Sequence, residues 1–441
     1  MNPLLSRLQP YPFERLRQLH ADITPNPAYK PISLGIGEPR HATPQLIKDA
    51  LSASLAGLAS YPATMGEPKL RQAMSDWLAR RYGLKVDAAT QILPVNGSRE
   101  ALFALAQTVI DPSQSGARPP PGRPKAGDAP SPCARGSESP EAHEVASLGA
   151  PIVVCPNPFY QIYEGAALLA GAQTWFAPSD PARNFAVDWA GVPEAVWAKT
   201  QLLFVCSPGN PTGAVMSLAE WELLFKLSDR HGFVIASDEC YSEIYFRDEA
   251  PLGGLQAAAQ LGRADFKNLI ALTSLSKRSN VPGLRSGFVA GDAALIKSFL
   301  LYRTYHGSAM SPVVQAASIA AWNDEQHVVD NRAQYREKFA QVTPLLATVM
   351  DVALPDAGFY LWAAIPKVFK GSDTAFAREL LALYNVVVLP GSYLARDGNS
   401  ARDALGFNPG AGRIRMALVA ETAECVEAAQ RIVQFIHSKV H

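Results

Sequence analysis

The sequence of 441 residues has few cysteines, no excess of charge of either sign and no long apolar run. Its five cysteines are scattered, without a Cys-x-x-Cys pair or a histidine cluster at zinc spacing, so we expect free thiols, no metal site and a reducing compartment. Lysine plus arginine and aspartate plus glutamate number 40 each, a balance that favours neither nucleic acid nor an anionic membrane as partner. No window reaches the ~18 apolar residues of a membrane span, and the proline-broken start is unlike a secretory signal. We therefore expect a cytoplasmic protein without a nucleic-acid or membrane partner.

What is present indicates a globular protein with two lobes. Hydrophobic residues make up 48% and charged residues 18% of the chain, an ordinary globular balance. A single core stops growing at about 250–300 residues, so a chain of 441 residues predicts more than one lobe. The segment 112–149 is dense in proline, glycine and serine, which predicts a flexible, exposed insertion.

Short apolar runs alternate with helical patterns from about residue 91, which is typical of βαβ units and a mainly parallel sheet. Seven strands are predicted for this sheet: Gln91–Val95, Pro151–Cys155, Gln173–Phe176, Leu202–Cys206, Phe233–Ala236, Leu269–Thr273 and Gly287–Ala290. Three more are predicted near the C-terminus: Gly358–Ala363, Val386–Leu389 and Ile414–Leu418. We therefore predict an α/β protein with a large domain over 44–312 and a smaller α+β domain over 313–441. Residues 1–43 would form an N-terminal arm and the start of the small domain.

A lysine follows one predicted strand in the string Thr273-Ser-Leu-Ser-Lys-Arg. Shelter at the strand end would lower the pKa of Lys277 and let its amine form a Schiff base with a carbonyl compound. Ser274 and Arg285 could grip a phosphate nearby. A solvated lysine is the ordinary explanation of such a string in isolation, so the neighbouring motifs decide.

Two other predicted strands also end on polar side chains. Phe233-Val-Ile-Ala-Ser-Asp-Glu-Cys-Tyr supplies Asp238 and Tyr241, and Leu202-Leu-Phe-Val-Cys-Ser-Pro-Gly-Asn supplies Asn210. Each gap, from 210 to 238 and from 238 to 277, suits a βαβ step of ~30 residues or a little more. The polar groups would then meet at the carboxyl edge of one sheet, where open α/β sheets bind ligands.

A glycine turn at Val95-Asn-Gly-Ser-Arg joins another strand to a helix. Backbone N–H groups of Ser98 and Arg99 at the start of that helix would face an anion. Plain helix capping is the alternative explanation.

Together these motifs resemble those of the fold-type I aminotransferases, in the order found in that family and over nearly the whole chain outside 112–149. The resemblance implies that the cofactor is pyridoxal 5'-phosphate (PLP) and that Lys277 carries it and moves the proton. It implies that Asp238 keeps the pyridine nitrogen protonated, while Asn210 and Tyr241 bond the phenolic oxygen of the ring. Ser98, Arg99, Ser274 and Arg285 would hold the phosphate.

The resemblance also implies residues that stack on the ring, bind substrate or come from a second subunit. Tyr160 is predicted to stack on the ring in preference to its neighbour Phe159. Tyr61 would reach the phosphate of a neighbouring subunit, so a homodimer with composite active sites is expected. Gly37 would pass over the substrate carboxylate, and Arg413 would bind that carboxylate with Arg415 as the fallback, since both share one face of a predicted strand.

The reaction that the resemblance implies moves an amino group from an amino acid to a keto acid, with 2-oxoglutarate as the expected acceptor. The strings Asn157-Pro-Phe-Tyr-Gln-Ile-Tyr-Glu-Gly-Ala and Leu389-Pro-Gly-Ser-Tyr-Leu-Ala-Arg are similar to a subgroup that acts on N-succinyl-LL-2,6-diaminopimelate in bacterial lysine synthesis. Aspartate or aromatic aminotransferases and carbon–sulfur β-lyases are the alternatives within the fold. A regulator with a DNA-binding head is disfavoured, because only about thirty residues precede the first motif and such a module needs more.

Overall fold

The computed structural model describes residues 1–114, 149–398 and 408–440. The predicted insertion at 112–149 lies almost wholly outside the described residues. All seven predicted strands of the large sheet are present within the described ranges, and a short eighth strand extends one edge. These strands are β2 (Ile92–Val95), β3 (Ile152–Asn157), β4 (Gln173–Asp180), β5 (Ala186–Val187), β6 (Thr200–Cys206), β7 (Val234–Asp238), β8 (Leu269–Ser274) and β9 (Gly287–Gly291).

The large sheet has the order β2-β9-β8-β7-β6-β3-β4-β5. Strands β8, β7, β6, β3 and β4 run parallel to one another, whereas β9 is antiparallel to both β2 and β8, and β5 is antiparallel to β4. The carboxyl ends of β6, β7 and β8 are therefore adjacent at one edge of the sheet. This confirms the α/β class and the mainly parallel sheet.

Helices cover both faces of the sheet because its strands are apolar on both sides. Along β6, Leu203 and Val205 pack into one core while Leu202 and Phe204 pack into the other, as the two-residue period of a strand requires. The first core is covered by α3 (Pro68–Tyr82), α8 (Leu218–His231), α9 (Gly254–Gln260) and α12 (Pro312–Asn323), with α2 (Gln45–Ala53) packed on α12 and α7 (Glu194–Trp197) at the rim. The second is covered by α4 (Ser98–Val109), α6 (Ile162–Leu169) and α11 (Ala293–His306).

Local sequence signals set the ends of these helices. Ser217 and Glu220 form a capping box at the start of α8, and Gly232 ends that helix in the left-handed conformation. Asp292 caps α11 by accepting hydrogen bonds from the backbone N–H groups of the first turn, and Gly307 ends it.

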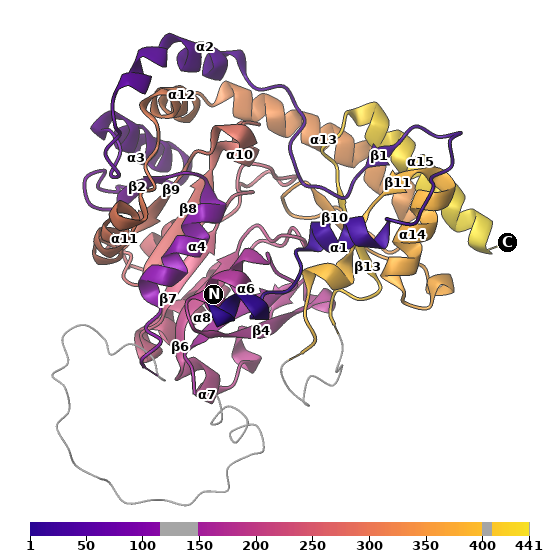
Figure 1. Cartoon of the computed structure of the whole chain (residues 1–441), viewed down its shortest axis with the longest axis horizontal. Helices are drawn as coiled ribbons and strands as arrows, with labels where there is room; N and C mark the ends of the chain where they lie inside the picture. The colour runs from indigo at the N-terminus through magenta and orange to yellow at the C-terminus, as the bar shows by residue number, and fades with distance from the viewer. Residues whose placement is uncertain (115–148, 399–407, 441) are drawn as a thin grey trace, which may run out of the picture.

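The second lobe lies beside the large sheet (Figure 1). It holds an antiparallel sheet of β10 (Tyr360–Ala364), β13 (Arg413–Ala417) and β12 (Leu389–Pro390). Around it pack α13 (Gln326–Ala347), α14 (Asp373–Tyr384) and α15 (Thr422–Val440).

The N-terminal segment belongs spatially to this second lobe. β1 (Ile32–Ser33) pairs in parallel with β11 (Val386–Val387), and α1 (Pro12–Leu19) packs against residues 391–394. The exact division into domains stays a prediction, and α12, just after the predicted boundary at 312/313, packs on α2 and α3. Within the described ranges, no helix combines the length and apolar character that a bilayer crossing needs.

Candidate active site

A cavity of about 600 Å³ opens at the carboxyl ends of β7 and β8 and is closed on its other side by residues of β10 and β13. Ten of the predicted site residues line it: Gly37, Ser98, Arg99, Tyr160, Asn210, Asp238, Tyr241, Ser274, Lys277 and Arg285. They come from segments more than two hundred residues apart, which meet because parallel strands end at a common edge.

Lys277 lies in α10 (Leu275–Arg278), a single turn that follows β8 and is capped by the hydroxyl of Ser274. Its Nζ donates a hydrogen bond to the carbonyl oxygen of Gly37 at 2.8 Å and lies 5.2 Å from the centre of the Phe359 ring. Burial lowers the pKa of Lys277 to about 8. A substantial fraction of this amine is therefore neutral near pH 8, which is the form that attacks a carbonyl carbon.

Asp238 ends β7 and is only 4% exposed. Its Oδ2 accepts a hydrogen bond from the hydroxyl of Tyr163 at 2.9 Å, and its Oδ1 accepts one from the backbone N–H of Cys240 at 3.3 Å. Burial raises the pKa of Asp238, while these hydrogen bonds oppose the rise. A carboxylate buried in this way is stabilised most by a cationic partner.

Tyr163 was not predicted for the site. Its ring stacks on Phe204 at 4.6 Å, which holds the hydroxyl toward Asp238. In the sequence it marks only the start of a helix, so no local signal distinguishes it from a core tyrosine.

Asn210 and Arg415 meet across the cavity. Arg415 donates from Nη1 to Oδ1 of Asn210 and from Nη2 to the carbonyl oxygen of Gly35, both at 3.1 Å. The guanidinium is buried and lies 4.3 Å from the centre of the Tyr360 ring. The Tyr360 hydroxyl lies 3.0 Å from the Tyr241 hydroxyl, so a second tyrosine that the sequence did not indicate adjoins the predicted one.

The structure places the two arginines of β13 differently, and which of them binds a carboxylate stays a prediction. Arg413 does not line the cavity; its guanidinium lies 4.9 Å from the centre of the Phe185 ring. Arg415 does line it. The two residues share a strand face, but one step of two residues moves the side chain by about 7 Å, and only the second position faces the cavity.

A glycine turn and a helix start form an anion cradle at the other end of the cavity. Gly97 has φ of 87°, and a Cβ there would lie 2.3 Å from Nη2 of Arg285. The Arg285 guanidinium donates to the carbonyl oxygens of Pro282 and Asn96 at 2.9 and 3.3 Å. The first turn of α4 places its free N–H groups and the positive end of its dipole beside this guanidinium.

Hydroxyl groups complete the cradle. Ser98 accepts a hydrogen bond from the Cys240 thiol at 3.0 Å, and Ser274 donates to the hydroxyl of Ser276 at 2.9 Å. Ser276 also lines the cavity, although only its neighbours in the string were predicted.

The structure separates the two adjacent aromatics. Tyr160 lines the cavity, and its hydroxyl accepts a hydrogen bond from Nε of Arg99 at 2.7 Å. Phe159 is 1% exposed and packs on Phe176 with ring centres 4.8 Å apart. Tyr160 is thus the ring available to a ligand, while its role in stacking stays a prediction.

Two further features bear on the site. Tyr61 is fully exposed in the single chain and does not line the cavity, so a role for it requires a second subunit. Tyr11, Pro12 and Phe13, at the start of α1, do line it. The predicted arm therefore contributes directly to the wall, which its proline-broken sequence did not indicate.

The residues present fit PLP. Arg285 and the start of α4 form a cradle suited to a phosphate, the buried Asp238 carboxylate suits a protonated ring nitrogen, and the Lys277 amine, with a pKa of about 8, lines the same cavity. Gly37 adds to this fit, because a Cβ there would lie 2.0 Å from the hydroxyl of Tyr360 and no other residue could approach so closely.

Known proteins resemble this chain over nearly its full length. The family model for aminotransferase class I and II matches residues 29–122 and 145–432. An LL-diaminopimelate aminotransferase of Dehalococcoides mccartyi is 30% identical over 83% of this chain and 84% of its own length. A crystal structure of an aminotransferase from Neisseria meningitidis is 53% identical, with a TM-score of 0.85 over 99% of this chain and 100% of that one.

A second structure shares the fold alone. It is a probable N-succinyldiaminopimelate aminotransferase from Thermus thermophilus, 24% identical, with a TM-score of 0.76 over 96% of this chain and 99% of that one. The family model covers far more than half of the chain, and the matched ranges include all ten predicted residues that line the cavity. The chain therefore belongs to the class I and II aminotransferases, which depend on PLP.

Proposed function

We propose that this aminotransferase moves the amino group of N-succinyl-LL-2,6-diaminopimelate to 2-oxoglutarate, in the cytoplasm. One observation carries the choice of donor: the two strings similar to the succinyl-specific subgroup hydrogen-bond to each other. Asn157 donates from Nδ2 to the carbonyl oxygen of Arg396 at 2.8 Å and accepts from its backbone N–H at 3.2 Å. The backbone N–H of Phe159 donates to the carbonyl oxygen of Leu394 at 3.0 Å. Because Tyr160 and Leu394 line the cavity, these strings form one wall of the substrate site.

A specific observation also favours a second donor, LL-2,6-diaminopimelate itself. The relative from Dehalococcoides mccartyi carries that substrate in its name and matches more than four fifths of the chain. Both donors present the same reacting end, an amino group beside a carboxylate, and differ only at the distal end. The free distal amine is cationic, whereas succinylation turns it into a neutral amide and adds a second carboxylate at that end.

In the proposed mechanism, PLP supplies an electron-withdrawing ring when it is bound. Arg415 binds the α-carboxylate of the donor through its guanidinium fork, in a geometry already set by Asn210 and Gly35. Lys277 moves the proton from the donor Cα, since its lowered pKa makes it an effective base near neutral pH. Asp238 would keep the ring nitrogen protonated, and its carboxylate is held in place by the Tyr163 hydroxyl and the backbone N–H of Cys240.

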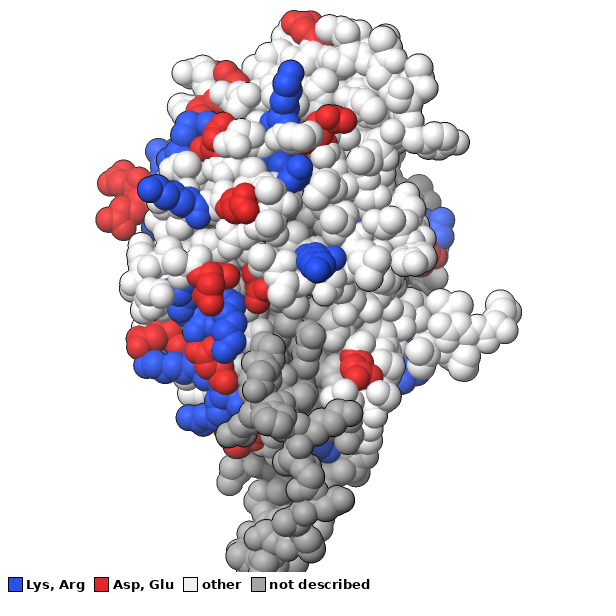
Figure 2. All heavy atoms as spheres, turned by 90° about the vertical axis from the view of Figure 1, so that its left-hand side faces the viewer, with Lys and Arg blue, Asp and Glu red and all other residues white. Residues whose placement is uncertain are grey.

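We further propose that two subunits share each active site. Tyr61 is fully exposed and lies beside other exposed apolar residues of the same segment, Leu55 and Leu58. Figure 2 views the molecule from the side of α2, α3 and α11 and shows broad uncharged areas with the charged side chains gathered toward one edge. A surface of this kind suits a two-fold interface between copies, with Tyr61 as a ligand of the partner subunit's phosphate site.

A donor panel tests the proposal. Purified enzyme with PLP and 2-oxoglutarate is given N-succinyl-LL-2,6-diaminopimelate, LL-2,6-diaminopimelate, aspartate, phenylalanine or cystathionine, and glutamate formation is followed. We expect the highest kcat/KM for the succinylated donor. A preference of tenfold or more for the free diamino acid would identify the second donor, and pyruvate with ammonia from cystathionine would indicate a β-lyase.

The same panel on two variants tests the carboxylate site. Arg415→Lys loses the guanidinium fork, so we expect kcat/KM to fall by one to two powers of ten for every donor, since a lost charged hydrogen bond contributes roughly 1.5–3 kcal/mol. Arg413→Lys is the matched control two residues away on the same strand, and its kcat/KM should stay within about twofold. The reverse pattern would restore Arg413 as the carboxylate ligand.

A further inference from the structure

A buried polar network lies behind the turn that carries Lys277. The side chain of Asn331, on α13, donates from Nδ2 to the carbonyl oxygens of Lys277 and Arg278 at 3.2 and 3.4 Å. Its Oδ1 lies 2.8 Å from Nδ1 of His41. Nε2 of His41 lies 2.6 Å from Nζ of Lys338, which is 1% exposed. His41, Asn331 and Lys338 thus form a relay that starts at the backbone of Lys277.

The hydrogen-bond geometry fixes the tautomer of His41. Asn331 must point its NH₂ group at the two carbonyl oxygens, so its oxygen faces His41 and also accepts from Nδ2 of Asn280 at 2.9 Å. Nδ1 of His41 must therefore carry the proton and donate. Nε2 then accepts a hydrogen bond from the Lys338 ammonium, which leaves the imidazole neutral.

The network joins two segments of the cavity wall. His41 lies in the loop that also carries Gly35 and Gly37, whose carbonyl oxygens accept hydrogen bonds from Arg415 and Lys277. The loop is tied a second time, because Thr43 donates to the carbonyl oxygen of Asn280 at 3.1 Å. Through Asn331, these hydrogen bonds therefore fix the loop of residues 35–43 and the α10 turn that carries Lys277 relative to each other.

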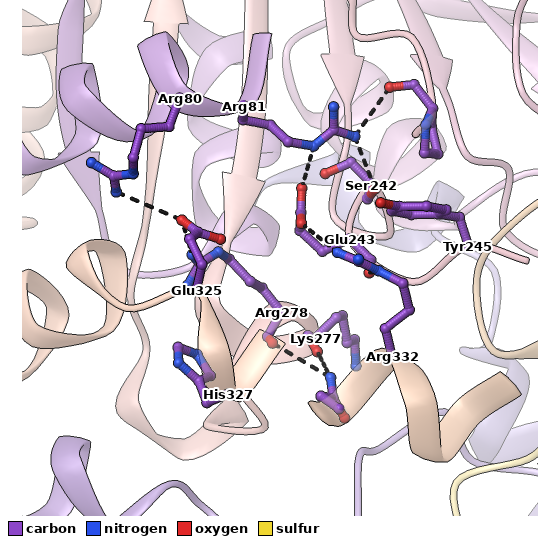
Figure 3. Close-up of polar contacts among 12 residues, drawn as sticks. Arg80, Arg81, Ser242, Glu243, Tyr245, Lys277, Arg278, Glu325, His327 and Arg332 are labelled. Atoms are coloured by element: carbon purple, nitrogen blue, oxygen red, sulfur yellow. Dashed lines mark hydrogen bonds and ion pairs between the residues drawn. The ribbon is translucent and has the colours of Figure 1, made fainter. Parts of the chain in front are cut away.

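A separate set of contacts holds the residue next to Lys277. The Arg278 guanidinium donates to Glu325 at 2.9 Å, and Glu325 also faces Arg80 at 3.6 Å (Figure 3). This set ties the turn to the N-cap residue of α13 and, through Arg80, to α3. The His41 network ties it to α13 at Asn331 and to the N-terminal loop.

We propose that His41 and Asn331 are positioning residues that hold the Lys277 amine in place against the Gly35–Gly37 loop. Protonation of His41 loosens this hold. The proposal rests on the proposed role of Lys277. A protonated imidazole could no longer accept from Lys338, and two cations would lie 2.6 Å apart in a buried site.

The charges around the pair decide the direction of the pH effect. Burial and Lys338 lower the pKa of His41, while Asn331 and Glu421 raise it, and the net effect is a decrease. Lys338 in turn faces Glu421, Glu337, Glu424 and the thiol of Cys425, and burial outweighs them, so its pKa is also lowered. The neutral imidazole stabilises the fold above its ordinary pKa of 6.5, and this contribution is lost as the pH falls through the lower folded-state value.

The first test uses the apoenzyme. The unfolding midpoint of the wild type should fall more steeply below pH 6.5 than that of His41→Gln, whose amide can donate and accept at similar positions but does not titrate. His437→Gln, at an exposed position of α15, is the matched control and should retain the wild-type pH profile. Identical pH profiles for wild type and His41→Gln would overturn the switch.

The second test uses the holoenzyme. Asn331→Ala and His41→Leu should lower kcat about tenfold, as expected when one hydrogen bond that positions a reacting group is lost. They should also shift the midpoint of the pH titration of the cofactor's visible absorbance, whereas His41→Gln should restore kcat at pH 8. Unchanged absorbance midpoints in both disruptive variants would contradict positioning.

Borohydride reduction and peptide mapping distinguish failure of the positioning role from failure of the proposed function. If the wild type forms its adduct at Lys277 while kcat and the absorbance midpoint of the variants are unchanged, the positioning role alone is refuted. A wild-type adduct at another lysine refutes the proposed function itself.

Discussion

Burial of the Lys277 amine destabilises the folded apoenzyme and also makes the amine more reactive, because it lowers the pKa. Burial lowers its pKa from the ordinary value of 10.5 to about 8. Below pH 8 the amine is charged in both the folded and the unfolded chain, and folding then carries the cost of desolvating it. Above pH 10.5 the amine is neutral in both states and the cost disappears.

We therefore predict that the apoenzyme of Lys277→Met is more stable than the wild-type apoenzyme at pH 7. The difference between 10.5 and about 8 corresponds to roughly 3 kcal/mol as an upper value, and it should shrink as the pH rises from 8 to 10.5. Urea unfolding at pH 7 and pH 10 measures it, with exposed Lys69→Met as the control. A gain of equal size at both pH values would attribute the effect to packing of the methionine.

At the scale of single elements, the anion cradle at the start of α4 depends on a backbone conformation that only glycine adopts readily. Gly97 precedes the helix with φ of 87°, and the space that a Cβ would need is filled by the Arg285 guanidinium. Because Gly97 has no side chain, the Arg285 guanidinium can lie against the turn that precedes the first N–H groups of α4.

We predict that Gly97→Ala weakens PLP binding about tenfold, because Arg285 must move away from the cradle and a charged hydrogen bond is worth at least 1.4 kcal/mol. Gly83→Ala is the matched control: Gly83 has φ of 69° at the end of α3, with nothing within 4 Å of the added carbon. Gly83→Ala should lose about 1 kcal/mol of stability from backbone strain, and Gly97→Ala should lose more, because its φ of 87° and ψ of 154° are adopted almost only by glycine. Only Gly97→Ala should lose cofactor affinity by fluorescence titration. Equal affinities in the two variants would show that the cradle does not depend on Arg285.

At the scale of the whole molecule, the proposed dimer makes a prediction that a single chain cannot. Lys277→Ala and Tyr61→Arg each inactivate a site that draws its lysine from one subunit and its tyrosine from the other. In a mixed dimer both defects fall in one site and leave the second intact. Random subunit exchange should therefore recover about one quarter of wild-type activity, since half of the dimers are mixed and each has one working site.

The control for this exchange is a mixture of Lys277→Ala with Asp238→Asn. Lys277 and Asp238 line the cavity of the same chain, so mixing should leave both sites of every dimer defective. Mixed dimers of the first pair that form, as shown by differently tagged subunits, and stay inactive would place Tyr61 outside the partner's site.

The sequence by itself determined that Asn210, Asp238 and Lys277 share a site. Each follows a buried strand, and parallel strands separated by helices deliver their carboxyl ends to one edge whatever the details of packing. The alternation of strands and helices predicted the α/β class, and the resemblance of the motifs to those of the aminotransferases predicted the family and ten of the residues that line the cavity.

Only the tertiary structure decided between residues that local patterns treat alike. Arg413 and Arg415 share a strand face, but which of them reaches the cavity depends on where β13 lies relative to Asn210, some 205 positions earlier in the chain. Phe159 and Tyr160 are adjacent aromatics, and the packing of Phe176 determines which is buried. The contacts of His41 and Tyr163 likewise join distant segments, so their partners are set by long-range packing and leave no mark on the sequence around them.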